Sequence, residues 1–184
     1  MTKLDIAFKE WSAICHALAT GRQSLILRKG GIAETAGRFV PEHFSFWLYP
    51  THFHEQQQRG LKTDAAIPPA GTPGSVTLSH WAEVQAVHHI TDLATALSFD
   101  AFHIWTPETI TQRFHYRTPG LYLLAVTIHE AKTVHEIVEA PEYAGCKSWV
   151  PLKEPFDQTP RGTVIDPQRE LLMSRLATIL SRSI

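Results

Sequence analysis

The sequence has little cysteine and no long hydrophobic run. Only two of its 184 residues are cysteines, Cys15 and Cys146, and they lie far apart in the chain. Since Cys15 falls within an apolar pattern, free thiols in a reducing compartment are favoured over a disulfide. The longest apolar stretches, such as 121–126, fall far short of the roughly 20 residues that span a bilayer. The N-terminus is charged and amphipathic rather than a signal peptide, so we expect a cytoplasmic protein with no membrane partner.

The chain also lacks an excess of charge of either sign. Its 17 basic and 18 acidic residues give a formal net charge of -1, which excludes coating of nucleic acid by bulk electrostatics. The charge is unevenly distributed, because residues 1–62 hold eight basic and five acidic side chains whereas residues 63–142 hold three and nine. Mixed surfaces often vary in this way, but the basic N-terminal third could also form a local anion-binding face.

Hydrophobic spacing predicts both helices and strands. Apolar residues at three- and four-residue spacing predict a helix over 4–20, ended by Gly21. Strands are expected at 22–28, 44–49 and 121–128, the last of them in mid-sheet, and at 134–138 and 147–152, while 75–90 predicts one bent strand or a hairpin. Capping residues predict helices at 92–98, at 107–114 and at about 166–182.

This order of elements indicates a single α+β domain over residues 1–184. We expect a mixed, curved sheet or a partly open barrel, flanked by the N-terminal and C-terminal helices.

The first candidate site is the end of the predicted strand 22–28. Arg28 and Lys29 precede Gly30 and Gly31, whose backbone amides another group can approach closely. Two cations beside such a turn make a plausible cradle for a phosphate or carboxylate. Neither GxxxxGK[ST] nor GxGxxG is present, so the turn is no nucleotide-binding fingerprint, and a solvated glycine turn at a strand end is the simpler interpretation.

The second candidate is a histidine pair. In an extended segment His52 and His54 point to the same face, which is a metal-ligand spacing, but no third ligand is identifiable and we expect no metal. His54 and Glu55 are the candidates for catalytic acid–base roles.

Aromatic and cationic residues also occur together further along the chain. His103 and Trp105 precede Arg113, and Lys147 lies close to Trp149. Stacking on a base and pairing with a phosphate require this combination, although an ordinary core edge with arginine stems packed on it has the same composition.

Six ordered motifs carry a resemblance to a known family: KEW at 9–11, LRKGGI at 27–32, EH at 42–43, WLYPT at 47–51, HIW at 103–105 and GCKSW at 145–149. Over about residues 5–152 the chain resembles the bacterial family catalogued as domain of unknown function 1802. Where the family pattern often has Tyr-Glu-His after YPT, this chain has His52-Phe53-His54, so only His54 matches a family imidazole. Some members are joined to Mrr-like restriction endonuclease domains, which implies a role beside DNA restriction and a reader domain on a PUA-like barrel.

The leading hypothesis is therefore a non-catalytic reader of DNA or RNA, including modified bases, that is linked to restriction or defence and needs no cofactor. Its stacking residues would be Trp47, Trp105 and Trp149, and its phosphate contacts Arg28, Lys29, Arg113 and Lys147. The partner would be a nucleic acid or a restriction nuclease; the oligomeric state is left open.

The alternative is a small metal-dependent hydrolase acting on a nucleotide or nucleic acid, which would use His54, Glu55 and Glu34 with a divalent ion. A purely structural interaction module is a third hypothesis. Both site hypotheses require Arg28, His54, Trp105 and Lys147 to converge on one concavity.

Overall fold

The computed structural model describes residues 3–30, 32–35, 38–52, 59–69, 71–143, 145 and 147–181. A seven-stranded sheet has the order β2-β7-β6-β5-β1-β8, with β9 paired to β7, and β3 and β4 form a separate two-stranded sheet. The elements are β1 Lys3–Trp11, α1 Ser12–Ala19, β2 Leu25–Arg28, β3 Ile32–Thr35, β4 Arg38–Pro41, β5 Ser45–Thr51, β6 Ser75–Ile90, α3 Leu93–Leu97, η1 Asp100–Phe102, α4 Pro107–His115, β7 Leu121–Val138, η2 Pro141–Tyr143, β8 Trp149–Asp157, β9 Pro160–Thr163 and α5 Arg169–Ser181.

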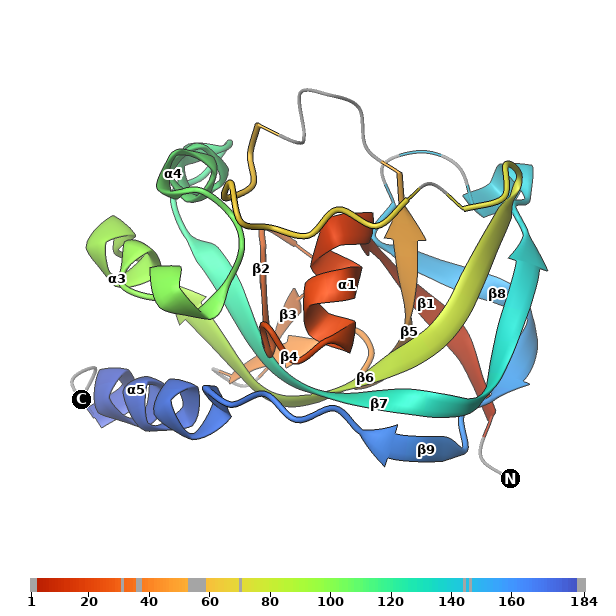
Figure 1. Cartoon of the computed structure of the whole chain (residues 1–184). Helices are drawn as coiled ribbons and strands as arrows, with labels where there is room; N and C mark the ends of the chain where they lie inside the picture. The colour runs from red at the N-terminus through yellow and green to blue at the C-terminus, as the bar shows by residue number, and fades with distance from the viewer. Residues whose placement is uncertain are drawn as a thin grey trace.

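The large sheet is mixed, curved and open. β1 and β5 are parallel, whereas the other neighbours pair antiparallel. The long β6–β7 pair is interrupted by bulges at Leu78/His80 and at Val84/Ala86, which bend a strand and increase its twist. The two strands therefore curve around α1 (Figure 1). The predicted α+β fold with a mixed, curved sheet is confirmed, and the sheet does not close, because β2 and β8 end its strand order.

The helix predicted over residues 4–20 is wrong in its first half. Residues Lys3–Trp11 form strand β1, and only Ser12–Ala19 is helical. In β1 the buried residues Leu4, Ile6, Phe8 and Glu10 follow a period of two and share one face. Since β1 pairs with β5 on one side and with β8 on the other, its sheet contacts override the helical spacing of the same apolar residues.

The central strands are longer than the sequence patterns indicate. Residues 75–90 form one strand, β6, and the two segments expected at 121–128 and 134–138 are parts of the single strand β7. As predicted, the apolar part of β7 lies in mid-sheet, between β2 and β6. The predicted C-terminal helix is confirmed as α5, which buries Leu172 and Leu176.

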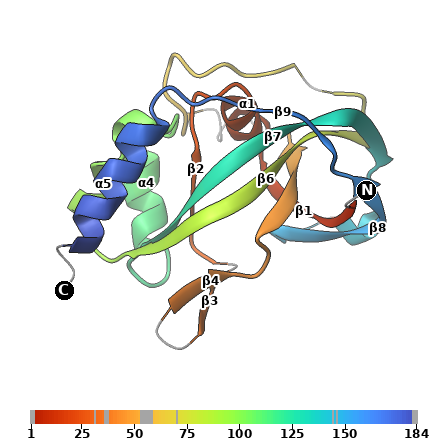
Figure 2. The same ribbon diagram turned by 90° about the horizontal axis from the view of Figure 1, so that it is seen from below.

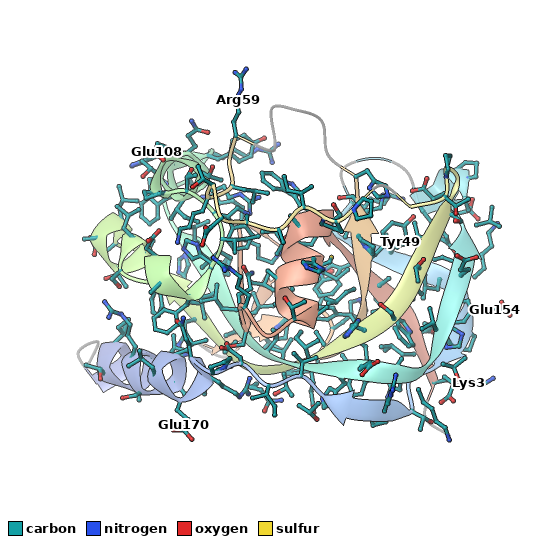
Figure 3. All side chains as sticks on the ribbon, viewed as in Figure 1. Lys3, Tyr49, Arg59, Glu108, Glu154 and Glu170 are labelled. Atoms are coloured by element: carbon teal, nitrogen blue, oxygen red, sulfur yellow. The ribbon has the colours of Figure 1, made fainter. Side chains whose placement is uncertain are left out.

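The helices divide between the inside and one end of the molecule. α1 lies within the curve of the sheet, and α3, α4 and α5 gather at one end of β6 and β7, away from the N-terminus (Figures 1 and 2). Charged side chains such as Lys3, Glu154 and Glu170 point outward, whereas Tyr49 points into the fold (Figure 3). In the described part of the chain no helix is both long and apolar enough to cross a membrane.

Candidate functional site

A pocket of about 690 Å³ lies where the carboxyl ends of the parallel strands β1 and β5 meet the end of β2, helix α4 and the start of β8. Its walls come from segments that are far apart in the sequence. The lining residues are Phe8, Lys9, Glu10, Trp11, Leu27, Arg28, Lys29, Gly30, Glu42, Thr51, His52, Arg113, Gly145, Lys147, Ser148 and Trp149.

Arg28 is the buried cation of this pocket. It is the last residue of β2 and is 9% exposed, and its Cζ lies 4.5 Å from the centre of the Phe8 ring and 5.5 Å from that of Trp149. Its Nε and Nη1 atoms are enclosed without a hydrogen-bond partner among the described residues. Burial lowers the pKa of the guanidinium to about 10, against the opposing influence of Glu10 and Glu42. Burying donor nitrogens of a charged group is costly unless another group supplies acceptors for them.

Lys29 lines the same pocket, but its ammonium group already donates three hydrogen bonds within the protein. Its Nζ donates to the backbone carbonyl oxygens of Phe114 at 3.0 Å and Gly120 at 2.7 Å, and also to that of Thr118. An ammonium group has three donors, so all of them are used. The expectation that Lys29 contacts a phosphate is therefore wrong: it joins the end of β2 to the C-terminal end of α4 instead.

Arg113 of α4 forms the opposite side of the pocket. Its Cζ lies 5.0 Å from the ring centre of Trp11 and 4.9 Å from that of Trp105, and its Nη1 donates to the Leu27 carbonyl oxygen at 3.4 Å. Burial lowers the pKa of Arg113, and Glu10 opposes that shift. Trp105 is completely buried, so the guanidinium and not a ligand stacks on its ring.

Lys147 and Trp149 line another side of the pocket. Trp149 is the first residue of β8, and Lys147 lies two residues before it. Lys147 is exposed, and no described acidic side chain pairs with it. Trp149 is half-buried and packs its ring edge-on against Phe8 and Phe46. Across the pocket, a Cβ added at Gly30 would meet no heavy atom within 4 Å, so the space beside its backbone is open.

Two predicted site residues lie away from the pocket. Trp47 has no exposed surface and its Nε1 donates to the Leu4 carbonyl oxygen at 3.1 Å, so the expectation that it stacks on a ligand is wrong. His103 is 3% exposed, and burial together with Lys62 lowers its pKa to about 4. It contacts Trp105 and is a neutral core imidazole rather than a ligand contact.

The histidine pair is only partly covered by the structure. His52 lines the pocket and its Nε2 accepts a hydrogen bond from the Gly71 amide at 3.2 Å. His54, Glu55 and Gly31 lie outside the described residues, as does the side chain of Glu34. In the described ranges no three His, Cys, Asp or Glu side chains gather as a metal site.

Some of the site residues predicted from the sequence therefore meet in this pocket, and others do not. Arg28, Gly30, Arg113, Lys147 and Trp149 line one concavity, with Trp105 behind Arg113. The acidic and aromatic residues of β1, namely Phe8, Glu10 and Trp11, were missed because this segment was assigned to a helix. The period-two alternation of Leu4, Ile6, Phe8 and Glu10 is the signal in the sequence that indicates a strand here.

The fold and the pocket define an α+β protein with a pocket at one end of an open sheet, lined by basic and aromatic side chains. A family model described as "Domain of unknown function (DUF1802)" matches residues 7–171, so the chain belongs to this family. No curated protein matches the sequence.

Two solved structures are similar in outline. One, described as the crystal structure of ASCH from Zymomonas mobilis, is 14% identical with a TM-score of 0.43, and the match covers 66% of this chain and 65% of that one. A serine-to-alanine mutant of the ZmASCH protein from the same organism is 11% identical with a TM-score of 0.43, covering 95% of this chain and 94% of that one.

Proposed function

We propose that this protein binds nucleic acid by taking one nucleotide into the pocket between β1, β2, α4 and β8. The observation that carries the proposal is the Arg28 guanidinium, which is nine-tenths buried, lines the pocket and has enclosed nitrogens without partners among the described residues. A phosphate oxygen is the acceptor that an arginine fork pairs with best, and such pairing would offset the cost of the buried charge.

The dimensions of the site agree with this ligand class. Its volume of about 690 Å³ lies within the range of roughly 300–1,000 Å³ that is usual for small-molecule sites. Lys147 offers an exposed ammonium for a neighbouring phosphate, and Trp149 offers an aromatic wall. With a net charge of -1, affinity would come from these local contacts and not from a general basic surface.

We also propose which nucleic acid the protein binds, with which protein partner it acts and where in the cell. The family resemblance supports DNA, with or without a modified base, as the nucleic acid and a restriction nuclease as the partner. The low cysteine content supports the cytoplasm as the place of action. A base that leaves the stack to enter such a pocket has an unpairing cost, which is lowest in single strands. Single-stranded DNA is therefore expected to bind more tightly than the matched unmodified duplex.

Fluorescence anisotropy with short labelled DNA and RNA strands of mixed sequence, at low salt, tests the proposal. Wild-type protein should bind, and Arg28→Gln should weaken binding by about tenfold or more, because a hydrogen bond to a charged group contributes roughly 1.5–3 kcal/mol. Arg161→Gln is the matched control: it removes the same charge from an exposed residue paired with Glu130. Competition with mononucleotides distinguishes a free nucleotide from a strand as the preferred ligand.

The proposal is overturned if no strand binds at low salt, or if Arg28→Gln binds as tightly as wild type. Thermal melting of both variants shows whether each is folded.

A further inference from the structure

The pocket contains a buried carboxylate as well as the buried guanidinium of Arg28. Glu10, in β1, is 9% exposed and lines the pocket, and its Oε1 accepts a hydrogen bond from the Trp11 amide at 2.9 Å. No donor from a described residue reaches its Oε2, and no described basic side chain lies within the 4.0 Å of an ion pair. A carboxylate only accepts hydrogen bonds, so Oε2 requires an N–H or O–H group from elsewhere.

Glu10 belongs to the same electrostatic site as the two arginines. Its charge favours the protonated forms of both Arg28 and Arg113, although it contacts neither guanidinium directly. The pocket therefore offers a donor-only group, Arg28, and an acceptor-only group, Glu10, each with unused hydrogen-bonding capacity toward the described residues. A ligand that satisfies both groups must carry acceptor oxygens at one end and N–H or O–H donors at the other.

Nucleotides differ in whether the base supplies those donors. Cytosine, adenine and guanine each carry an exocyclic amino group that donates to a carboxylate, and acidic side chains accept from the cytosine N4 amino group in known complexes. In thymine and uracil the only N–H of the pairing edge lies between two carbonyl oxygens, which repel a carboxylate.

We infer that the pocket selects a nucleotide whose base bears an exocyclic amino group, with Glu10 as the specificity-determining residue that accepts a hydrogen bond from that group. This inference rests on the proposed nucleic-acid binding. It assigns the phosphate to Arg28 and the edge of the base to Glu10, so the two groups act on opposite ends of one nucleotide.

The test compares oligo-dC with oligo-dT strands of equal length at neutral pH, since both bases are single-ring pyrimidines and cytosine is then unprotonated. Wild-type protein should prefer oligo-dC by about tenfold, the scale of one good base-edge contact. Glu10→Gln should reduce this preference to about twofold or less, because an amide donates as well as accepts. Glu170→Gln, which removes an exposed carboxylate on α5, should keep it (Figure 3).

Glu10→Asp covers the case in which Glu10→Gln does not fold. It retains the negative charge near both arginines but shortens the side chain by one methylene, so the preference for oligo-dC should again be lost. If Glu10 only balances the charge of the arginines, this variant will keep the full preference, and the inference is then wrong.

The possible failures can be told apart. Equal binding of oligo-dC and oligo-dT by wild-type protein, or a preference for oligo-dT, overturns the base selectivity and leaves nucleic-acid binding standing. Binding of no strand at all overturns the proposed function, and the selectivity with it.

Discussion

At the scale of single residues, some charged side chains of the pocket can be predicted from the sequence and others cannot. Arg113 and Lys147 could be selected because each lies close to aromatic residues in a short motif, and Arg28 because it precedes Lys29 and a glycine turn. Glu10 could not, although it lies in the KEW motif, because nothing in that motif shows that its carboxylate is buried, and its burial depends on neighbours from β5 and β8. For the same reason nothing in the sequence indicates that the donors of Lys29 are used by three carbonyl groups of the chain.

Burial of His103 leads to a pH dependence of stability. Its pKa is lowered to about 4 in the folded protein from the ordinary value of 6.5, so between these values the unfolded chain binds more protons. The free energy of unfolding is therefore expected to fall as the pH decreases through this window, by up to about 3 kcal/mol from this residue alone. Above pH 6.5 the imidazole is neutral in both states and contributes no such dependence.

Urea denaturation at several pH values measures this effect. His103→Leu should flatten the dependence between pH 4 and 6.5, whereas His115→Gln, which changes an exposed imidazole at the end of α4, should retain it. An unchanged pH profile in His103→Leu would contradict the assignment. His80 and His88, whose pKa values burial also lowers, contribute to the slope that remains, as do carboxyl groups such as Asp92 and Asp157 whose pKa values hydrogen bonds lower.

At the scale of secondary structure, β1 shows why a correct apolar pattern can give the wrong element. Leu4, Phe8 and Trp11 fit a helix, while Leu4, Ile6 and Phe8 fit a strand, and local spacing does not decide between the two. The decision comes from β5 and β8, which lie about 40 and 140 residues further along the chain and pair with β1 on both sides. Elements with strong local signals, such as the Pro107 start of α4, were predicted correctly.

The turn that ends α1 provides a stability test at this scale. Gly21 has φ +70°, and a Cβ added there would lie 2.1 Å from the carbonyl oxygen of Ile165, in the segment between β9 and α5. Gly21→Ala is expected to reduce the free energy of unfolding by about 2 kcal/mol or more, since left-handed backbone alone costs roughly 1–2 kcal/mol and the segment must also move.

Thermal melting checks this expectation. Gly162→Ala is a suitable control, because a Cβ at Gly162 meets nothing within 4 Å and should leave the melting temperature almost unchanged. Equal melting temperatures for the two variants would show that the segment before α5 does not pack against Gly21 as described.

At the scale of the whole molecule, near-neutral charge limits how much affinity can come from phosphates. If Arg28 and Lys147 each pair with one phosphate, two phosphates are neutralised. The slope of log K against log salt concentration on single-stranded DNA should then be about -1.4, from roughly -0.7 for each phosphate. Titrations at several salt concentrations measure it, and Lys147→Gln should reduce it by about half. A slope several times steeper would mean that contacts outside the pocket dominate.

The hydrogen bonds of Lys29 affect the conformational cost of binding a ligand in the pocket. Its ammonium, directly after β2, binds the carbonyl oxygen of Phe114 in α4 and that of Gly120 just before β7, and so links the two elements that carry Arg28 and Arg113. The spacing of the two guanidinium groups is thereby set before any encounter. A preorganised receptor of this kind loses little conformational entropy on binding, so the ordering cost falls on the incoming strand.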